Sequence, residues 1–352
     1  MDMLGSVLIM LFMLSILVVV HEFGHFIAAR LFKVKVEEFS IFMGPKIFSR
    51  VSKKTGTRWS IRALPIGGFC LMEGEEETVQ SSTSFDSKPW YARAVILLAG
   101  ALMNLLLAIL IIAIMFSFFG YETNKVSEVL VAEEGTYPAQ ELGFEVGDRI
   151  ISYDGKRVHT PNDYRIFEMV DKDMTSEIEI KKADGTVRKH TIEREKLENG
   201  AKSYIGFRFG VEKGNFFGIL GNTMLYIFSL IKSVFYAIFW LITGQLGLDA
   251  VASPIGMTGI VNEVVQQDAS WLPKLLALIN MTALISANLA VFNLLIVPGL
   301  DGGKLLFILI ELLRGGKKIS PETEAKFSYV GIGLLLLLAL VVAGNDILRL
   351  IR

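Results

Sequence analysis

Four long stretches without a charged residue stand out in the pattern of hydrophobic and polar positions along this chain of 352 residues. They are residues 3–20, 94–121, 275–300 and 327–345. A helix needs about 20 mainly apolar residues to cross the hydrocarbon core of a bilayer. The pattern therefore predicts a polytopic α-helical membrane protein with about four transmembrane helices.

A fifth apolar region is ambiguous, because Lys232 divides it into residues 214–231 and 233–248. A lysine at the middle of a bilayer is costly. We therefore expect this region to lie in the membrane interface, or to pack against the helix bundle, rather than to form a fifth span.

The composition agrees with a membrane protein and excludes other classes. Hydrophobic residues make up 52% of the chain and charged residues 20%, whereas soluble proteins carry about 25% charged residues. A chain this hydrophobic is not intrinsically disordered. Its net charge of −1 provides no basic field for a polyanion, so no nucleic-acid partner is expected.

The basic residues predict the orientation in the membrane. Lys and Arg are concentrated in the segment after the first span, residues 30–62, and in the short loop between the third and fourth spans. Loops rich in Lys and Arg stay on the cytoplasmic side. Both loops are therefore expected in the cytoplasm, and the long segment after the second span outside it.

Residues 125–210 change character and indicate a domain outside the bilayer. Residues 177–181 alternate in polarity like a half-buried strand, and Asp184-Gly185 is a turn between this strand and a returning one. The order Leu142-Gly143, Gly147-Asp148 and an isoleucine strand resembles a bacterial PDZ domain. PDZ domains bind peptides by adding a strand to a sheet edge. A compact plug that blocks bulky proteins from the membrane fits these residues equally well.

The candidate chemistry follows the first apolar stretch, in the motif His21-Glu22-Phe23-Gly24-His25. Positions i and i+4 lie on one face of a helix. Two imidazoles there can bind one zinc ion, while Glu22 faces a metal-bound water. Ionisable side chains beside an apolar span are costly and usually functional. The alternative is a helix end whose polar residues simply reach water.

A catalytic zinc site needs a third protein ligand and one open position. The two remaining histidines, His159 and His190, belong to the predicted outer domain. Cys70 is one candidate ligand. Asp301 is another, because it lies at the cytoplasmic end of the third span, where the first span also ends. The alternative for Asp301 is a helix-ending turn, since Asp-Gly-Gly is a good turn sequence.

Taken together, these motifs resemble the site-2 protease family of intramembrane zinc metalloproteases. The matching features are the motif at residues 21–25, the PDZ-like insertion and the segment 293–303, which ends in Leu-Asp-Gly-Gly. One PDZ-like domain among four helices resembles the bacterial regulator-of-sigma-E protease group. The resemblance covers nearly the whole chain. The sequence departs from the family at Ile296, where proline is usual.

The resemblance implies that His21, His25 and Asp301 bind zinc and that Glu22 is the general base. Further segments resemble the family with less specificity, and each has a purely structural alternative. They contribute candidate substrate-binding residues: Asn104 in the second span, and Gly67 and Gly68 in a membrane-associated hairpin formed by residues 42–45 followed by residues 59–72. Asn293 is a further candidate, because its amide can donate to a developing oxyanion. Gly100 is explained by close helix packing alone.

The resemblance thus implies an intramembrane protease that cleaves single-span membrane proteins, and anti-sigma factors and remnant signal peptides are substrates typical of the family. It would be a multi-pass protein of the inner membrane, with its site near the cytoplasmic side and peptide ends as candidate partners of the outer domain. The alternatives are a catalytically silent membrane scaffold with a peptide-binding module, and a metal carrier. The expected parts are residues 1–124 with two spans and the hairpin, 125–210 with the PDZ-like domain, 211–274 with the interfacial segment, and 275–352 with two spans.

Overall fold

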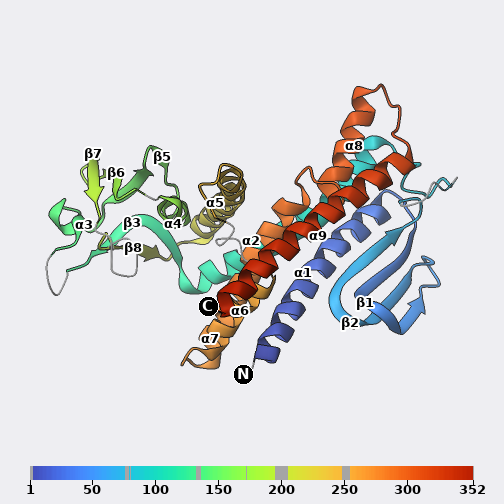
Figure 1. Ribbon diagram of the computed structural model, residues 1–352, viewed down its shortest axis with the longest axis horizontal. Helices are drawn as coiled ribbons and strands as arrows, with labels where there is room; N and C mark the ends of the chain where they lie inside the picture. Colours follow the sequence, from blue (N-terminus) through green and yellow to red (C-terminus); the bar gives the residue numbers. More distant parts are fainter. Residues whose placement is uncertain are drawn as a thin grey trace. The chain divides into compact units, whose positions relative to one another are not determined.

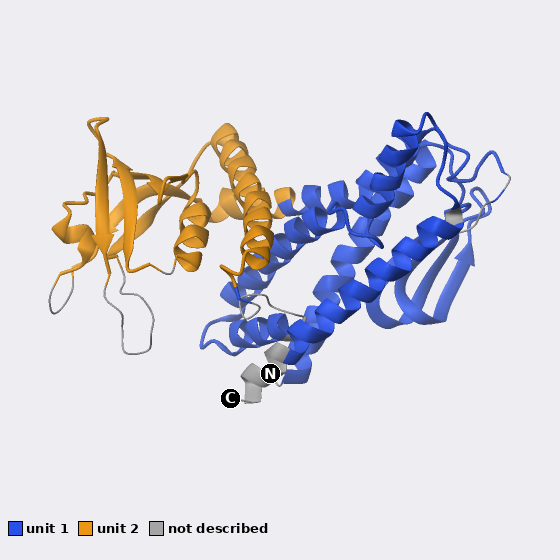
Figure 2. Cartoon of the chain, turned by 45° about the horizontal axis from the view of Figure 1, so that its top comes forward, with its two compact units in different colours: residues 1–108, 247–352 blue, residues 109–246 orange. Residues whose placement is uncertain are grey.

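The computed structural model describes residues 3–75, 79, 81–131, 136–171, 173–194, 205–247 and 254–351 (Figure 1). The chain divides into two compact units (Figure 2). Unit 1 consists of residues 1–108 and 247–352, and unit 2 of residues 109–246. A single long helix passes from one unit into the other.

Unit 1 is mainly helical. Its helices are α1 (Met3–Leu31), α2 (Trp90–Phe119, which continues into unit 2), α6 (Pro254–Gln266), α7 (Trp271–Asn293), α8 (Asp301–Leu313) and α9 (Pro321–Ile351). The four predicted spans correspond to α1, α2, α7 and α9. In the described part of the chain, five helices are long and apolar enough to cross a membrane. The fifth is α5 (Phe216–Ile242), in unit 2.

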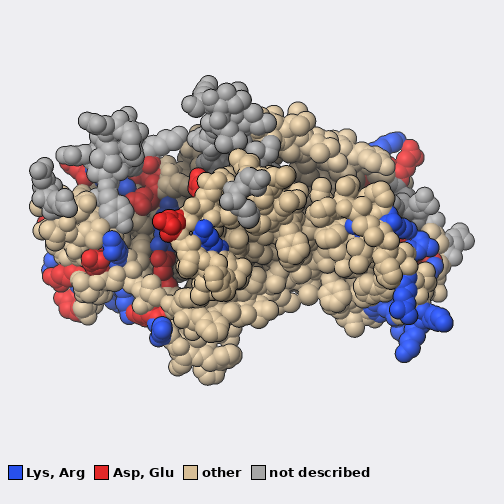
Figure 3. All heavy atoms as spheres, turned by 90° about the horizontal axis from the view of Figure 1, so that it is seen from below, with Lys and Arg blue, Asp and Glu red and all other residues tan. Residues whose placement is uncertain are grey.

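One side of α1 is buried and the other is exposed. The buried side follows the helical repeat of three to four residues and is formed by Met10, Met13, Leu17, His21, Gly24, His25 and Ala28. Leu4, Leu8, Phe12 and Ile16 form part of the exposed side. On the face in Figure 3, a broad area is largely free of Lys, Arg, Asp and Glu, as expected of a surface in contact with lipid.

Helices α1 and α2 pack backbone to backbone. A Cβ atom on Gly24 would lie only 2.2 Å from the carbonyl oxygen of Ala99, so no other residue fits there without moving a helix. Small residues at such crossings are how membrane helices approach one another closely. This crossing brings α2 against the turn of α1 that carries the candidate motif.

The loop between α1 and α2 forms a sheet of two long strands, β1 (Val36–Val51) and β2 (Arg58–Met72), beside α1 (Figure 1). Both strands bend, so the first half of β1 pairs with residues 68–72 of β2 on one side and with residues 58–61 on the other. Aromatic contacts of Phe26 on α1 with Phe39 and Trp59 hold the sheet against the helix. The predicted hairpin, residues 42–45 followed by 59–72, thus consists of part of β1 and nearly all of β2.

Glu38 holds the bent sheet together from its centre. Its carboxylate accepts hydrogen bonds from Ser60 at 2.7 Å, Arg62 at 2.9 Å and Lys46 at 3.0 Å. Burial alone would raise the pKa of Glu38, but these donors lower it to about 2. The side chain is therefore charged at any physiological pH, and it ties three segments of the sheet to one anion.

Unit 2 carries a sheet of six strands in the order β7-β6-β4-β3-β8, with β5 paired to β4. Its elements are β3 (Tyr121–Val129), α3 (Pro138–Glu141), β4 (Arg149–Tyr153), β5 (Lys156–Arg157), α4 (Pro161–Val170), β6 (Thr175–Lys181), β7 (Val187–Glu193), β8 (Phe207–Glu212) and α5. The strand predicted at residues 177–181 belongs to β6, and the turn at Asp184-Gly185 joins it to β7 as expected. The inward-facing residues Ile178, Ile180 and Ile192 are fully buried.

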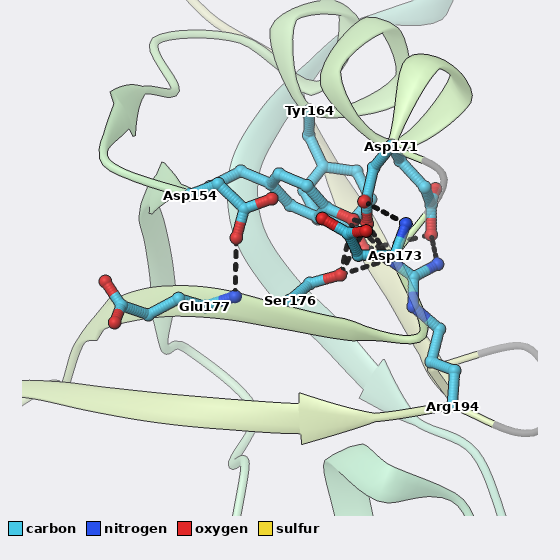
Figure 4. A network of polar contacts seen from close by, with 9 residues as sticks. Asp154, Tyr164, Asp171, Asp173, Ser176, Glu177 and Arg194 are labelled. Atoms are coloured by element: carbon cyan, nitrogen blue, oxygen red, sulfur yellow. Dashed lines mark hydrogen bonds and ion pairs between the residues drawn. The ribbon is translucent and has the colours of Figure 1, made fainter.

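A buried polar network closes one side of this core (Figure 4). Arg194 follows β7 and donates to Ser176, Glu168 and the hydroxyl of Tyr153. The same tyrosine hydroxyl donates to Asp171 at 2.8 Å. Because these hydrogen bonds join residues at the ends of α4, β6 and β7, they fix the three ends relative to one another.

Helix α5 packs on α4 and supplies a cation to it. Lys232 Nζ lies 2.7 Å from Asp163 Oδ1, and Ser229 donates to the same carboxylate at 2.6 Å. Next to them, Tyr236 and Trp240 contact Phe167 edge to face. Lys232, which divides the apolar stretch of α5, is therefore paired with a carboxylate of α4 in the same unit.

Candidate metal centre

The histidine pair lies on the buried side of α1. The helix continues without a break to Leu31, so His21 and His25 face the same direction one turn apart. Their exposed fractions are 7% and 6%, and their Nε2 atoms are 3.1 Å apart. The two nitrogen lone pairs are thus directed at a common volume.

Asp301 brings a carboxylate to the same volume. It is the first residue of α8, and its Oδ2 lies 3.1 Å from His21 Nε2 and 3.4 Å from His25 Nε2. One ligand atom from each of these three residues lies within 4.8 Å of the others. No further group of this kind occurs in the described part of the chain, and Cys70 is not a member of this one.

The surroundings of the three side chains fit a zinc ion. His25 Nδ1 contacts the carbonyl oxygen of Ile96 at 2.8 Å and can donate its proton there, which leaves Nε2 as a free acceptor. Asp301 Oδ2 is buried and accepts no hydrogen bond from the residues that the structure describes, although both imidazoles are close. Buried acceptors that face one another without a donor repel, and a cation between them removes the conflict. Two nitrogens and one carboxylate oxygen are a typical catalytic zinc set, with a fourth position free.

Gly100 on α2 forms a wall of this volume. A Cβ atom at this position would lie 2.5 Å from His25 Nε2 and 2.7 Å from His21 Nε2. Any side chain would therefore displace the ligand atoms themselves. From the sequence, we attributed Gly100 to helix packing alone. A contact between the second span and residues 21–25 cannot be recognised from the local sequence.

Glu22 points to the hairpin rather than to α2. Its Oε2 accepts a hydrogen bond of 2.9 Å from the backbone N–H of Cys70 on β2. Cys70 thus contributes to this site through its main-chain N–H and not through its thiol. Nearby, Gly68 packs so closely that a Cβ atom would lie 2.8 Å from the carbonyl oxygen of Ser40. Gly67 has φ +67°, a backbone conformation that favours glycine.

The two candidate asparagines differ in their surroundings. Asn293 is the last residue of α7, and its amide nitrogen lies 3.3 Å from His21 Nδ1. Asn104 lies one turn beyond Gly100 and is fully buried, with neither amide atom hydrogen-bonded in the described part of the chain. Its backbone carbonyl instead accepts a 2.7 Å bond from Ser286. Asn293 therefore contacts His21, whereas no such contact of the Asn104 side chain is seen among the described residues.

The segment before Asp301 is a compact turn that depends on glycine. A Cβ atom on Gly302 would lie 2.2 Å from the carbonyl oxygen of Leu295, and one on Gly303 2.5 Å from that of Val297. Ile296, where the family usually has proline, is 67% exposed. The turn forms with isoleucine at this position because the packing is made by the backbone on either side of it.

Comparison with known proteins agrees with this site. The model of peptidase family M50 matches residues 9–338. The chain belongs to this family of site-2 proteases, and it is a membrane-embedded zinc metalloprotease. The scaffold and metal-carrier alternatives are thereby set aside.

Proteins that are similar to this chain over nearly its whole length occur in several bacteria. A protein of Fusobacterium nucleatum named as a zinc metalloprotease is 33% identical over 97% of this chain and 98% of its own. One of Clostridium perfringens, named likewise, is 34% identical over 95% and 96%. The regulator of sigma-W protease RasP of Bacillus subtilis is 28% identical over 98% and 99%. The resemblance seen in the sequence is thus confirmed at the level of the family.

Replacement of Gly100 by alanine tests the packing at this centre. We expect Gly100→Ala to lose bound zinc, because the new methyl group would overlap both Nε2 atoms. Zinc content per purified protein, measured by elemental analysis, checks this. Gly333→Ala is the matched control, since a Cβ atom on this helical glycine meets nothing within 4 Å. Equal zinc in both variants would contradict the assignment of this volume to the metal.

Proposed function

We propose that this chain hydrolyses peptide bonds within or near the transmembrane segments of single-span membrane proteins. In this proposal His21, His25 and Asp301 hold the zinc ion, and Glu22 is the general base. The observation that carries it is the convergence of three buried ligand atoms on one volume, with a carboxylate that is not a ligand next to it.

The chemistry divides between the metal and the side chains. Bound zinc lowers the pKa of a water molecule to about 7 and polarises the scissile carbonyl. Glu22 takes the proton of the attacking water and later delivers it to the leaving nitrogen. Because the N–H of Cys70 holds one oxygen of this carboxylate, the other oxygen is free for proton transfer.

The asparagines are proposed to act on the substrate side of the site. The amide of Asn293 is near enough to His21 to orient this ring or to donate to the developing oxyanion. The unpaired amide atoms of Asn104 suit a substrate carbonyl or a water molecule on its way to the site.

The edge of β2 is the proposed substrate cradle. A transmembrane helix hides its peptide bonds in its own hydrogen bonds, so the substrate must unwind before it is cleaved. An unwound segment can pair with a free strand edge. Gly67 and Gly68 lie on β2 within a few residues of the amide that contacts Glu22. Because they have no side chains, we propose that the substrate backbone can approach this part of the strand closely.

The natural substrates are proposed from chemistry and from a relative. The Bacillus subtilis relative is named as a regulator of sigma-W, which makes anti-sigma factors one candidate class. Remnant signal peptides, which are single apolar helices, are the other. Mass spectrometry of membrane peptides that accumulate when Glu22 is replaced distinguishes these classes, and accumulation of neither would refute both.

The β-rich domain of unit 2 is proposed to be a PDZ-like module. Strand β8 lies at one end of the sheet order, where a peptide strand can be added. A module that captures peptide ends makes cleavage depend on the substrate's terminal sequence. A plug instead makes cleavage depend on the size of the substrate's domain outside the membrane. Substrates that differ only in terminal sequence, or only in the size of that domain, therefore distinguish the two roles.

The chain order supports a location of α5 on the membrane surface. His21 lies in the second half of α1, and Asp301 follows the end of α7. The two side chains are in contact in unit 1, so α1 and α7 end on the same side of the bilayer. Helix α2 leaves that side and α7 returns to it. A single crossing by α5 between them would put Asp301 on the wrong side, because the 13 residues of α6 are too few to cross back.

The basic loops then favour an inner-membrane protein whose metal centre is near the cytoplasmic side. Unit 2 would lie outside the cytoplasm together with α5. The exposed aromatic side of α5, which includes Phe217, Phe228 and Phe239, would lie in the lipid interface.

The decisive test of the activity is replacement of Glu22 by glutamine. We expect Glu22→Gln to reduce cleavage of a tagged single-span substrate by at least about 100-fold, because loss of a general base costs about 10²- to 10⁴-fold. The shortened product is measured on immunoblots, with a zinc chelator as a second arm. Zinc content should remain at the wild-type level.

Asp301→Ala is the matched control for this experiment, since it removes a proposed ligand and should lose both zinc and activity. Product from Glu22→Gln at the wild-type rate would exclude Glu22 as the base. Zinc retained by Asp301→Ala at wild-type affinity would exclude it as a ligand.

A proline at position 70 tests the contact between β2 and the base. We expect Cys70→Pro to lower kcat several-fold, because proline lacks the N–H that holds Glu22. Cys70→Ala keeps this N–H and should cleave like the wild type. The comparison is made by kinetics on a fluorogenic peptide, and equal rates for the two variants would show that the contact is dispensable.

The location of α5 is tested by labelling its two ends. In a Cys70→Ala background, Asn215→Cys and Thr243→Cys place a thiol before and after the helix. We expect a membrane-impermeant thiol reagent to label both from outside intact spheroplasts. Lys317→Cys, between α8 and α9, should be labelled only after lysis. Outside labelling at only one end of α5 would mean that the helix spans the bilayer.

A further inference from the structure

Arg93 and Glu311 form a buried ion pair away from the metal ligands. Arg93 Nη2 lies 2.7 Å from each carboxylate oxygen of Glu311, and the residues are 6% and 9% exposed. The Nε of Arg93 also donates to the carbonyl of Lys88, at 3.2 Å. The guanidinium is therefore held on two sides, in the first turn of α2 and against the last turn of α8.

Stability alone does not account for this pair. Removing two charges from water costs about as much as their attraction returns, and apolar residues of similar size often stabilise a fold equally well. A buried pair contributes most clearly when it selects one arrangement of two elements over its alternatives. The arrangement selected here is that of α8 on α2.

Helix α8 supplies the carboxylate of the metal centre from its first residue. Glu311 follows Asp301 by ten positions, which corresponds to about 15 Å along the helix axis and about 80° around it. Two contacts so separated fix both the tilt and the rotation of a helix. Next to Glu311 in the last turn of α8, Leu312 and Leu313 are exposed.

Helix α2 is the appropriate partner for this restraint. Gly100, seven positions after Arg93, lies directly against the two imidazoles. The ion pair therefore joins the helix that carries the carboxylate to the helix that backs the histidines. Zinc–ligand distances of about 2.0–2.2 Å leave little tolerance for movement between them.

We infer that Arg93 and Glu311 are positioning residues, which hold Asp301 in register with His21 and His25 by fixing α8 on α2. The inference rests on the proposed zinc ligands. It assigns to the pair an effect on metal affinity in addition to any effect on folding.

The test replaces the pair by methionines, Arg93→Met with Glu311→Met, in the full-length protein in lipid nanodiscs. Zinc affinity is measured by competition with a chromophoric chelator, and folding by thermal unfolding of the metal-free protein. We expect zinc affinity to fall about tenfold or more, the scale of losses when residues supporting metal ligands are changed. The unfolding midpoint of the metal-free protein should stay unchanged, and kcat should fall more than KM changes.

The exposed pair Glu322–Lys326 on α9 is the matched control, because its double methionine variant should leave zinc affinity and kcat unchanged. Wild-type zinc affinity in the Arg93/Glu311 double variant would overturn the inference. Should this variant not fold, Glu311→Gln takes its place, and wild-type zinc affinity in the folded Glu311→Gln protein would equally overturn it.

Asp301→Ala, measured alongside, separates the two levels of the argument. Loss of zinc in Asp301→Ala with normal affinity in the double methionine variant overturns the positioning role alone. Normal affinity in Asp301→Ala contradicts the ligand set and with it the inference that rests on this set.

Discussion

The convergence of three buried ligand atoms is the constraint on which the candidate metal centre of unit 1 depends. One ligand atom each of His21, His25 and Asp301 lies within 4.8 Å of the others, and burial of such polar atoms without a partner is costly. A cation satisfies all three at once, so metal binding and the packing of α1, α2 and α8 are coupled. The glycines at 24, 100 and 302 follow from the same constraint, because each removes a side chain where backbones must approach.

The meeting of His21 with Asp301 also restricts the path of the chain through the membrane. In the proposed topology, helices α1 and α7 end on the same side of the membrane, and the segment between α2 and α7 begins and ends on the other side. Lys232 supports this in chemical terms, because its ion pair with Asp163 binds α5 to a domain rich in charge. A helix can thus meet the length and hydropathy of a span and still be favoured at the surface.

Residues 21–25 were predictable from the sequence because the spacing of the motif is local and the helix that carries it is long. Asp301 was predictable as a candidate ligand because it lies at the same end of its span as residues 21–25. The strand and turn at residues 177–185 were predictable from the alternation of polar and apolar residues and from Asp184-Gly185. Gly100, Arg93 and Glu311 were not, because their roles arise from contacts between segments distant in the sequence. The long β1–β2 sheet was only partly foreseen, since its bends follow from the anchoring of three segments on Glu38 rather than from a two-residue repeat.

The bent sheet matters because it brings a main-chain amide to Glu22, the proposed general base. Side chains can supply zinc ligands and a base, but an extended substrate is best recognised by backbone groups that do not depend on its sequence. In this structure the strand that offers such groups also holds Glu22 through Cys70. The strand, the proposed base and the proposed metal ligands therefore share one scaffold, and a substrate paired to β2 would be aligned with Glu22 by the same strand that orients this side chain. This coupling explains why a sheet, which usually requires water or protein around its edges, is retained next to helices of such high hydropathy.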